Sequence, residues 1–365
     1  MMIFNRIMKK WVLLFLLIYT TALCSFFKKK SLVTSPGLEF PLAPKNEISF
    51  DGEINKALIL SQDMVFFSSS KGSLYTINEP GKGLKLIYQS GIDFISPPYI
   101  HGEFIFVYDS KNQIYCIHKN GALEWKTSIK EKISSGIQTT SEKIFFGTDK
   151  GRFYCFQLDS GECVWEVKTG GAIRSLPVVI QETIIFGCDD HNLYFLSMDG
   201  KIKYKHETGG KIRGSLIYEK SYLYFGSYDE FFYCFDRHKK KVKWKVKTGG
   251  RVHTYPLIHK KYVFVNSWNN VLFCLNKKNG TVLWWNKIPS RCKYPMEIVG
   301  DKILVTSLSS VLNCFDLKTG KDQGKYVAEN EVRSNPLWFH DGVMLSVYDK
   351  GSDSSQVVFL NNNKE

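Results

Sequence analysis

The feature that most constrains the fold of this chain is a repeat with a period near 40 residues. The stretch FYCFQLDSGECVWEVKTGG starts at Phe153 and returns as FYCFDRHKKKVKWKVKTGG from Phe232. In each of the clearer copies a cysteine precedes an aromatic residue by nine or ten positions. The cysteines are Cys116, Cys155, Cys234, Cys274 and Cys314, and the tryptophans are Trp125, Trp165, Trp244 and Trp284. A further copy has Phe195 and Tyr204 at these two positions. A fixed period of this length indicates stacked repeats of one structural unit.

Each period contains four short runs of β-branched and aromatic residues separated by turn signals. In the third copy the runs are SSGIQTT, KIFFGT, RFYCFQL and CVWEVKT. No amphipathic helix interrupts them. Four antiparallel strands per unit are typical of one blade of a β-propeller, so the sequence predicts an all-β fold.

The number of copies predicts an eight-bladed propeller. The copies are expected to begin near Ile48, Ile92, Glu131, Ala172, Lys211, Arg251, Arg291 and Glu331. The last copy has room for only three strands, and a spare strand-like segment, GLEFPLAPKNE, precedes the first. A ring closes without exposed edges if this segment supplies the missing outer strand. We therefore expect residues 31–47 to form a linker and ring-closing strand, and residues 48–365 to form the propeller.

The recurring cysteine and tryptophan are best explained by packing. The third strand of a blade is buried on both faces, where cysteine acts as a small apolar residue. The aromatic residue on the fourth strand is expected to dock adjacent blades, at Trp125, Trp165, Tyr204, Trp244 and Trp284. Equivalent cysteines on different blades are too far apart for disulfides. Pairing among Cys163, Cys188 and Cys292, which have no repeat partners, stays open.

These residues resemble the PQQ-like (quinoprotein-type) propeller repeat, whose motif is Ala-x-Asp-x-x-Thr-Gly-x-x-x-Trp. Cys274, Asn276, Asn279, Gly280 and Trp284 fit the motif with cysteine in place of alanine. Cys314, Asp316, Thr319 and Gly320 fit its first half. Leu86, Tyr204 and Gly324 depart from it at the tryptophan position, and Lys239 and Lys240 replace Thr-Gly. The resemblance covers residues 36–365 and implies the propeller fold. The family includes dehydrogenases, assembly scaffolds and sensor domains.

The first thirty residues predict export. A basic start, MMIFNRIMKK, precedes the mostly apolar run WVLLFLLIYTTALCSFF and three lysines. The run is short for a membrane-spanning helix, which needs about 20 residues. Lipidation at Cys24, a cleaved signal sequence and an uncleaved anchor are three alternatives. Each of them places the propeller in the cell envelope, on the periplasmic side of a membrane.

The formal charge of the whole chain is +14. From Glu39 onward 43 Lys and Arg face 35 Asp and Glu, which leaves +8. A basic exported body favours acidic partners over nucleic acid. Lysines also alternate with apolar residues along two expected outer strands, at Lys201, Lys203 and Lys205 and at Lys241, Lys243, Lys245 and Lys247. That pattern indicates protected edge strands, with docking on an anionic surface as the alternative.

The sequence shows no nucleophile, zinc, phosphate-loop or haem motif. Asp189, Asp190 and His191 stand together, but at an expected turn, so a turn role is preferred to a metal site. No cofactor is predicted. Quinoprotein dehydrogenases hold their cofactor in the channel of such a propeller, which keeps a PQQ-dependent enzyme as an alternative.

The preferred function is a monomeric scaffold for protein–protein interaction. Exported single propellers of this length resemble the BamB-type lipoproteins of outer-membrane protein assembly. The resemblance implies a partner in the envelope, with an acidic or β-strand docking segment. A receptor for an anionic small molecule or an envelope glycan is a further alternative.

A ring of bases is the candidate partner-binding site. Five successive copies carry a base or histidine at the start of the innermost strand, where Ile95 and Ser134 stand in two earlier copies. The five are Arg174, Arg213, His253, Lys293 and Arg333. We expect them to line one mouth of the channel and attract an acidic ligand; the alternative is that they cap neighbouring turns. Ile212, Arg213 and Gly214 also match the apolar-Arg-Gly segment that faces the partner in BamB-like scaffolds.

Overall fold

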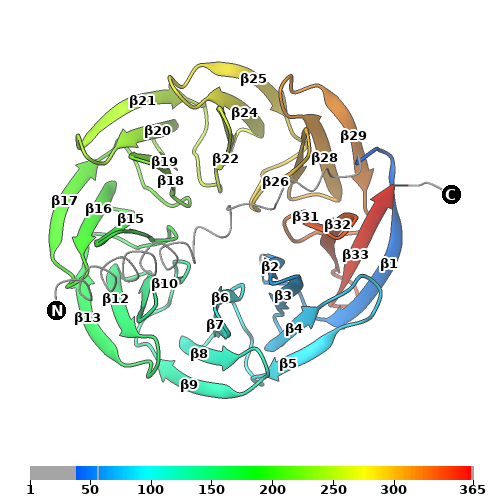
Figure 1. Cartoon of the computed structure of the whole chain (residues 1–365), viewed down its shortest axis with the longest axis horizontal. Helices are drawn as coiled ribbons and strands as arrows, with labels where there is room; N and C mark the ends of the chain where they lie inside the picture. The colour runs from blue at the N-terminus through cyan, green and yellow to red at the C-terminus, as the bar shows by residue number, and fades with distance from the viewer. Residues whose placement is uncertain (1–37, 56, 363–365) are drawn as a thin grey trace, which may run out of the picture.

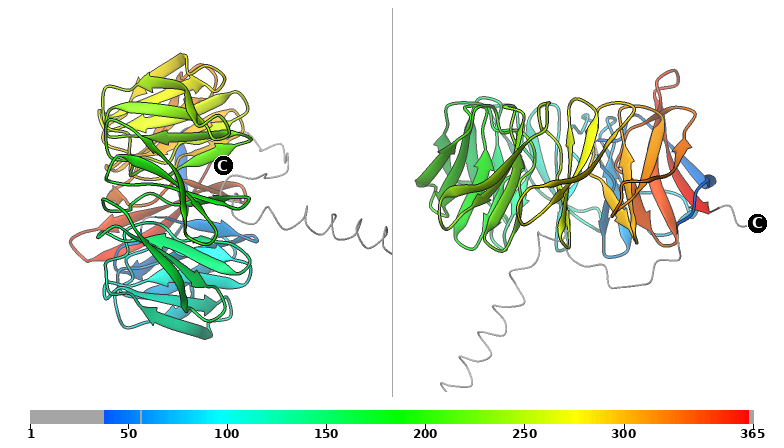
Figure 2. Two further views of the ribbon diagram at one scale, coloured as in Figure 1. Left: turned by 90° about the vertical axis from the view of Figure 1, so that its left-hand side faces the viewer. Right: turned by 90° about the horizontal axis from the view of Figure 1, so that it is seen from above.

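The computed structural model describes residues 38–55 and 57–362 and forms a closed ring of eight β-sheets (Figure 1). Seen from the side, the ring is a disc with a single layer of blades (Figure 2). The expected eight-bladed propeller is thereby confirmed. None of the described residues belongs to a helix long and apolar enough to cross a membrane.

Blades 1 to 7 each contain four antiparallel strands in sequence order, from the channel outward. Blades 1 to 3 are β2(Ile59–Ser61) to β5(Lys85–Gln89) through β3(Met64–Ser68) and β4(Ser73–Ile77); β6(Tyr99–His101), β7(Phe104–Tyr108), β8(Gln113–His118) and β9(Leu123–Ser128); and β10(Gln138–Thr139), β11(Lys143–Gly147), β12(Arg152–Gln157) and β13(Cys163–Lys168). Blades 4 and 5 are β14(Val178–Ile180), β15(Thr183–Gly187), β16(Asn192–Ser197) and β17(Ile202–Glu207); and β18(Ile217–Glu219), β19(Tyr222–Gly226), β20(Phe231–Asp236) and β21(Lys241–Lys247). Blades 6 and 7 are β22(Leu257–His259), β23(Tyr262–Ser267), β24(Val271–Asn276) and β25(Val282–Lys287); and β26(Glu297–Val299), β27(Lys302–Thr306), β28(Val311–Asp316) and β29(Asp322–Val327).

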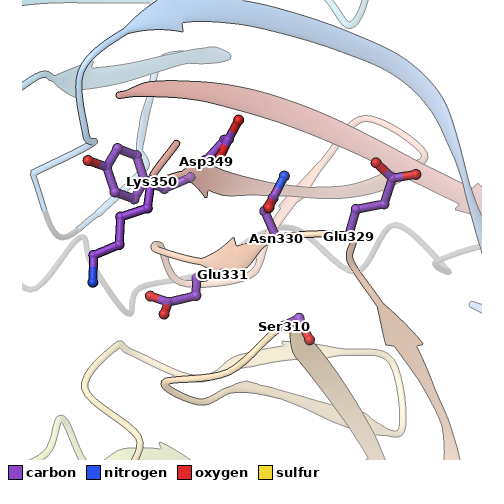
Figure 3. Close-up of a pocket in the computed structure, with 7 residues that line it drawn as sticks. Ser310, Glu329, Asn330, Glu331, Asp349 and Lys350 are labelled. Carbon is purple, nitrogen blue, oxygen red and sulfur yellow. The ribbon is translucent and has the colours of Figure 1, made fainter. Parts of the chain in front are cut away.

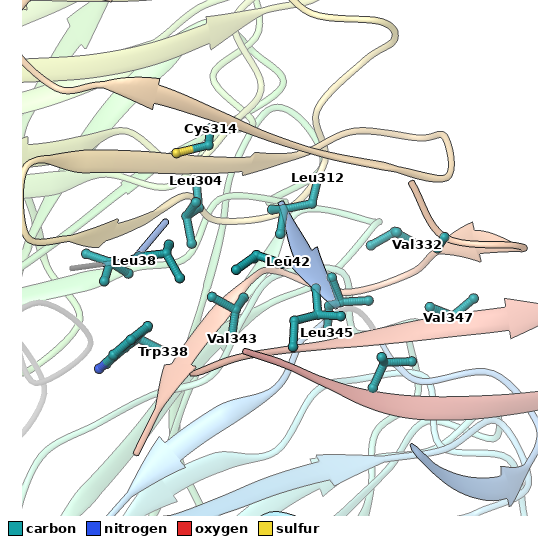
Figure 4. Close-up of a cluster of buried hydrophobic side chains, with 14 residues drawn as sticks. Leu38, Leu42, Leu304, Leu312, Cys314, Val332, Trp338, Val343, Leu345 and Val347 are labelled. Atoms are coloured by element: carbon teal, nitrogen blue, oxygen red, sulfur yellow. The ribbon is translucent and has the colours of Figure 1, made fainter. Parts of the chain in front are cut away.

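Blade 8 is built from both ends of the chain, as expected. It contains β30(Glu331–Val332), β31(Leu337–Phe339), β32(Gly342–Asp349), β33(Ser354–Asn362) and the outer strand β1(Leu42–Asp51). β1 pairs antiparallel with β33 from Leu42 opposite Asn362 to Asp51 opposite Ser354. The buried cluster around Leu42 and Leu345 joins blades 7 and 8 at this closure (Figure 4).

The first copy begins later than the sequence predicted. Ile54 and Phe94 occupy equivalent positions, because each forms an isolated bridge to the turn of its own blade. The first copy therefore starts near Gly52, and Ile48 lies within the closing strand β1. The apolar residues of β1 had the same alternating pattern as a first strand, which is why the boundary was misplaced.

The second and third strands of each blade are the most buried, whereas innermost strands such as β6 and β18 are half-buried. Third strands such as β12 are buried along almost their whole length, whereas outer strands such as β13 alternate between exposed and half-buried positions. The repeat cysteines Cys116, Cys155, Cys234, Cys274 and Cys314 are buried free thiols. Burial raises the pKa of Cys155 and Cys234 to about 11 and of Cys116, Cys274 and Cys314 to about 12. Cys188 and Cys292 are also buried and free, and Cys163 is exposed and free, so no two of these three are paired.

The repeat tryptophans of blades 2, 3, 5 and 6 each dock on the next blade. The Trp165 indole N–H donates to the Met198 carbonyl at 3.0 Å, and a Cβ at Gly200 would lie 2.8 Å from the indole. The same pair of contacts recurs at Trp125 with Gly161, Trp244 with Gly280 and Trp284 with Gly320. Tyr204 donates instead to the Lys240 carbonyl at 3.2 Å, where lysine replaces the glycine.

The missing tryptophan of blade 7 is replaced from the other end of the chain. Gly324 stands at the tryptophan position, and a Cβ there would lie 2.6 Å from the Cβ of Phe40. Phe40 packs against the buried cluster that closes the ring. An aromatic side chain therefore fills this junction although the repeat does not supply it.

Candidate functional site

The predicted bases lie on one face of the ring. This face carries the interblade loops and the turns between the second and third strands, and we call it the loop face. Backbone hydrogen bonds connect the two features in each blade, as from Asp189 N to Ala172 O and from Tyr228 N to Lys211 O. Each predicted base therefore lies close to a turn of its own or a neighbouring blade.

Two of the five bases share one carboxylate. Arg213 donates to Asp189 through Nε at 2.7 Å and through Nη2 at 2.6 Å, a bidentate pair. Arg174 Nε lies 3.5 Å from Asp189 Oδ2. The hydrogen bond with Asp189 raises the pKa of Arg213 despite partial burial. This sector of the loop face is therefore partly neutralised, and Asp189 has a structural role that the sequence did not reveal.

Arg333 is also paired with acidic residues. Its Nη1 lies 3.4 Å from Glu53 Oε1 across the junction of blades 8 and 1, and Nη2 contacts Glu331. Its guanidinium also lies 5.6 Å from the centroid of the Tyr348 ring. Arg333 thus helps to hold the closing blade against blade 1.

The remaining two positions differ from the three arginines. His253 is half-buried and meets the rings of Tyr228 and Trp268 edge to face, with centroids 5.9 and 5.6 Å away. Lys293 is exposed. The five bases are therefore brought to one face, but as separate sectors with different partners.

The residues beside Arg213 do not reach the surface. Ile212 is fully buried, and a Cβ at Gly187 would lie 2.2 Å from it. Gly214 is also buried, and a Cβ added there would lie 2.9 Å from the Thr254 carbonyl oxygen. Ile212 and Gly214 are therefore positioning residues, and of this segment only Arg213 can contact a partner.

Sequence reasoning missed the residues of the neighbouring turns. The position of Asp149 and Asp189 is occupied by Tyr228 in blade 5 and Trp268 in blade 6. The backbone N–H groups of Trp268 and Leu308 donate hydrogen bonds to the carbonyls of Arg251 and Arg291, which lie in the interblade loops. Alignment of the turns GTDKG, GCDDH, GSYDE and NSWNN would have shown the change from aspartate to an aromatic residue.

Acidic side chains gather on the loop face around the ring closure, at blades 7, 8 and 1. A pocket of about 310 Å³ lies at the junction of blades 7 and 8 (Figure 3). It is lined by Ser310, Glu329, Asn330, Glu331, Tyr348, Asp349 and Lys350. A second hollow of about 490 Å³, between blades 8 and 1, includes Asp51 and the ion pair of Lys71 with Asp353. The loop face therefore carries carboxylates near the ring closure, while Arg251, Arg291 and Lys293 are exposed on blades 6 and 7.

Asp190 and His191 belong to a turn. Asp190 accepts hydrogen bonds from Gly170 N, Asn192 N and the Tyr194 hydroxyl. Burial would raise the pKa of Asp190, but these hydrogen bonds outweigh it and the pKa is lowered. Among the residues that the structure describes, no group of three or more His, Cys, Asp or Glu side chains is placed to hold a metal ion.

Tyrosine, leucine and glycine form one level of the channel wall. Tyr99 of blade 2 and Tyr255 of blade 6 lie close enough across the channel for Tyr255 to raise the pKa of Tyr99, in addition to the larger effect of burial. A Cβ at Gly136 would lie 2.5 Å from Leu176 Cδ1 and 3.2 Å from the Tyr99 hydroxyl. Tyrosine, leucine and glycine at this level offer no cation for the carboxylates of a tricarboxylate quinone cofactor.

The predicted export segment, residues 1–30 with Cys24, lies outside the described residues.

Comparison with known proteins gives a family and a fold. A family model described as "Outer membrane protein assembly factor BamB" matches residues 118–217 and 205–364. The crystal structure of BamB from Moraxella catarrhalis superposes with a TM-score of 0.74 at 15% identity, covering 89% of this chain and 99% of that one. The crystal structure of the computationally designed Ika8 protein superposes with a TM-score of 0.72 at 12% identity, covering 88% and 99%. No curated protein sequence matches the chain. Since a designed protein superposes almost as well as a natural one, these structural likenesses show the fold alone.

Proposed function

The chain belongs to the family of the outer membrane protein assembly factor BamB, and from this premise we propose that it is an envelope scaffold that binds a partner protein during outer-membrane protein assembly. The loop face is the proposed docking surface. The predicted export segment, with Cys24 as the lipidation site, would hold the propeller at a membrane on the periplasmic side. Arg174, Arg213, His253, Lys293 and Arg333 are the proposed contacts.

The observation that carries this proposal is the position of these five residues on one face of a rigid ring. Every blade is docked on its neighbour, so the side chains of the face are held at fixed distances from one another. Exposed positive charge on such a face attracts an acidic partner and accelerates its association. A scaffold needs such a surface and no reactive group.

Because some of the five residues are paired with carboxylates, only the exposed ones can be substituted without weakening the fold. Charge reversal of Arg213 or Arg333 would place a carboxylate against Asp189 or Glu53 and weaken the fold, because like charges repel at short distance. Arg174 and Lys293 are exposed, and Arg213 keeps Asp189 paired when Arg174 is removed. Arg174→Gln combined with Lys293→Gln is therefore the informative variant.

The experiment is crosslinking and affinity capture of the full chain from solubilised envelopes. We expect recovery of an outer-membrane assembly protein, and about fivefold lower recovery with the double variant, since two exposed charge contacts are lost. The control is Lys260→Gln with Lys278→Gln, two exposed lysines on hairpins of the opposite face of the ring. Equal recovery by both double variants, with folding intact, would exclude the loop face as the docking surface.

A second arm of the experiment addresses the enzyme alternative. The purified chain is supplied with the quinone cofactor and calcium and tested for cofactor binding and for oxidation of alcohols and sugars. We expect neither, because Tyr99, Gly136 and Tyr255 supply no cation for the carboxylates of the cofactor. Turnover in this assay would replace the scaffold proposal with a dehydrogenase.

A further inference from the structure

The loop face of blades 5 to 7 carries a cluster of three mutually contacting rings with arginines over them. We call it the cationic aromatic patch and define it as Tyr228, Arg251, His253, Trp268 and Arg291. The Tyr228 and Trp268 centroids are 5.6 Å apart, and the His253 ring lies edge to face with both. All three rings are half-buried, so they form a fixed floor with an accessible surface.

Three arginines lie over the rings, and the one nearest Tyr228 is Arg213, whose guanidinium carbon lies 5.1 Å from the Tyr228 centroid while its N–H groups bind Asp189. Among the described residues, the other two have no such partner. The guanidinium carbon of Arg251 lies 5.3 Å from the Tyr228 centroid, and that of Arg291 lies 5.0 Å from the Trp268 centroid. Cation–π contact fixes the plane of a guanidinium and leaves its N–H edge able to bind an anion. Arg174, Arg213 and Arg333 are paired with carboxylates. Within residues 38–55 and 57–362, Arg251 and Arg291 have no carboxylate at ion-pair distance.

The composition of the patch is that of a protein-binding surface. Tryptophan, tyrosine and arginine are the residues that contribute most to binding energy at protein interfaces. Tyr228 and Trp268 replace the aspartates found at this turn in blades 3 and 4, so this turn position carries no carboxylate beside Arg251 and Arg291. The pocket at the junction of blades 7 and 8, with Glu329, Glu331 and Asp349 in its lining, lies next to the patch and would repel an acidic chain that extended over it.

We propose that the cationic aromatic patch binds an extended acidic peptide segment that carries an aromatic side chain. Its carboxylates bind Arg251 and Arg291, and its ring packs on Trp268. This inference rests on the proposed scaffold function and adds to it the sector of the loop face and the chemistry of the segment.

The first experiment measures binding of a fluorescently labelled glutamate–tyrosine copolymer to the full chain by anisotropy. Arg251→Gln with Arg291→Gln should weaken binding about tenfold, because two charge-assisted hydrogen-bonding groups are lost. The control is Lys132→Gln, an exposed base at the same register in blade 3, whose turn carries Asp149. This control should bind within about twofold of the unaltered chain.

The second experiment separates the aromatic contribution from charge. Trp268→Leu is the chosen variant because Leu308 occupies the same position in blade 7, so the fold accepts leucine there. The unaltered chain should bind the glutamate–tyrosine copolymer more tightly than polyglutamate. Trp268→Leu should bind the two polymers equally, since stacking on the indole is lost.

Three results would overturn the inference. The first is that Arg251→Gln with Arg291→Gln binds the copolymer as tightly as the Lys132→Gln control does. The second is that the unaltered chain shows no preference for the copolymer over polyglutamate. The third is that it binds a single-stranded oligonucleotide more tightly than either polymer. Envelope capture that survives loss of copolymer binding would contradict this inference alone. Copolymer binding without capture of an assembly protein would contradict only the proposed function.

Discussion

At the scale of single residues, a tryptophan and a glycine from neighbouring blades form one contact. The glycine of the turn between the third and fourth strands leaves room for the indole of the preceding blade, as at Gly280 beneath Trp244. The same glycine has a positive φ of 78°, which other residues adopt at a cost. In the motif Thr-Gly-x-x-x-Trp, the glycine therefore contacts the tryptophan of the preceding blade, and the tryptophan contacts the glycine of the next blade.

Gly280→Ala should destabilise the propeller more than Gly91→Ala. Both glycines have positive φ, at 78° and 70°, so the backbone of both alanine variants is strained. A Cβ at Gly280 would lie 2.7 Å from Trp244, whereas nothing lies within 4 Å of a Cβ at Gly91. We expect an additional loss of about 1–3 kcal/mol at Gly280, measured by urea unfolding. Equal losses would show that the indole contact is unimportant for stability.

At the scale of elements, the closing strand β1 decides whether the ring is complete. It covers β33 and carries Leu42 into the buried cluster, while Phe40 just before it fills the place beside Gly324. Without β1, the edge of β33 would expose unpaired backbone groups. The ends of the described chain are therefore bound to each other, and the closure contributes to the stability of blades 7, 8 and 1.

Leu42→Ala should weaken the closure by about 2–5 kcal/mol, because Leu42 is buried and its removal leaves a cavity. Hydrogen exchange should accelerate in β1 and β33 first. The control is Lys45→Ala, an exposed residue of the same strand. Uniform acceleration over all blades would indicate that the ring unfolds only as a whole.

At the scale of the whole molecule, the ring has an uneven distribution of charge and a pH-dependent stability. Burial lowers the pKa of His101, His206 and His259, which lie in three different blades. A histidine whose folded pKa lies below the unfolded value of about 6.5 binds more protons when unfolded. Its contribution to stability is therefore complete above that value and is lost as the pH falls below it.

The urea midpoint should consequently decrease between pH 7.5 and pH 5. His101→Gln keeps a polar group near Thr139, which hydrogen-bonds to His101 at 3.1 Å, but removes one titrating site. We expect this variant to show a smaller decrease between the two pH values, because its stability no longer depends on protonation at that site. A pH dependence identical to that of the unaltered chain would assign the effect to other groups.

The amino-acid pattern alone was enough to predict the period, the four strands of each blade, the number of blades and the closure by an N-terminal strand. These follow from apolar alternation and turn residues within about 40 positions, so they are local properties that repeat. The position of the bases on one face was also predictable, because a register repeats with its blade. Only the tertiary structure decided that Arg174 and Arg213 share Asp189, that Ile212 is buried, and that Phe40 fills the place beside Gly324. These contacts join different blades or opposite ends of the chain, and their partners depend on how the curvature of the ring brings neighbouring turns together.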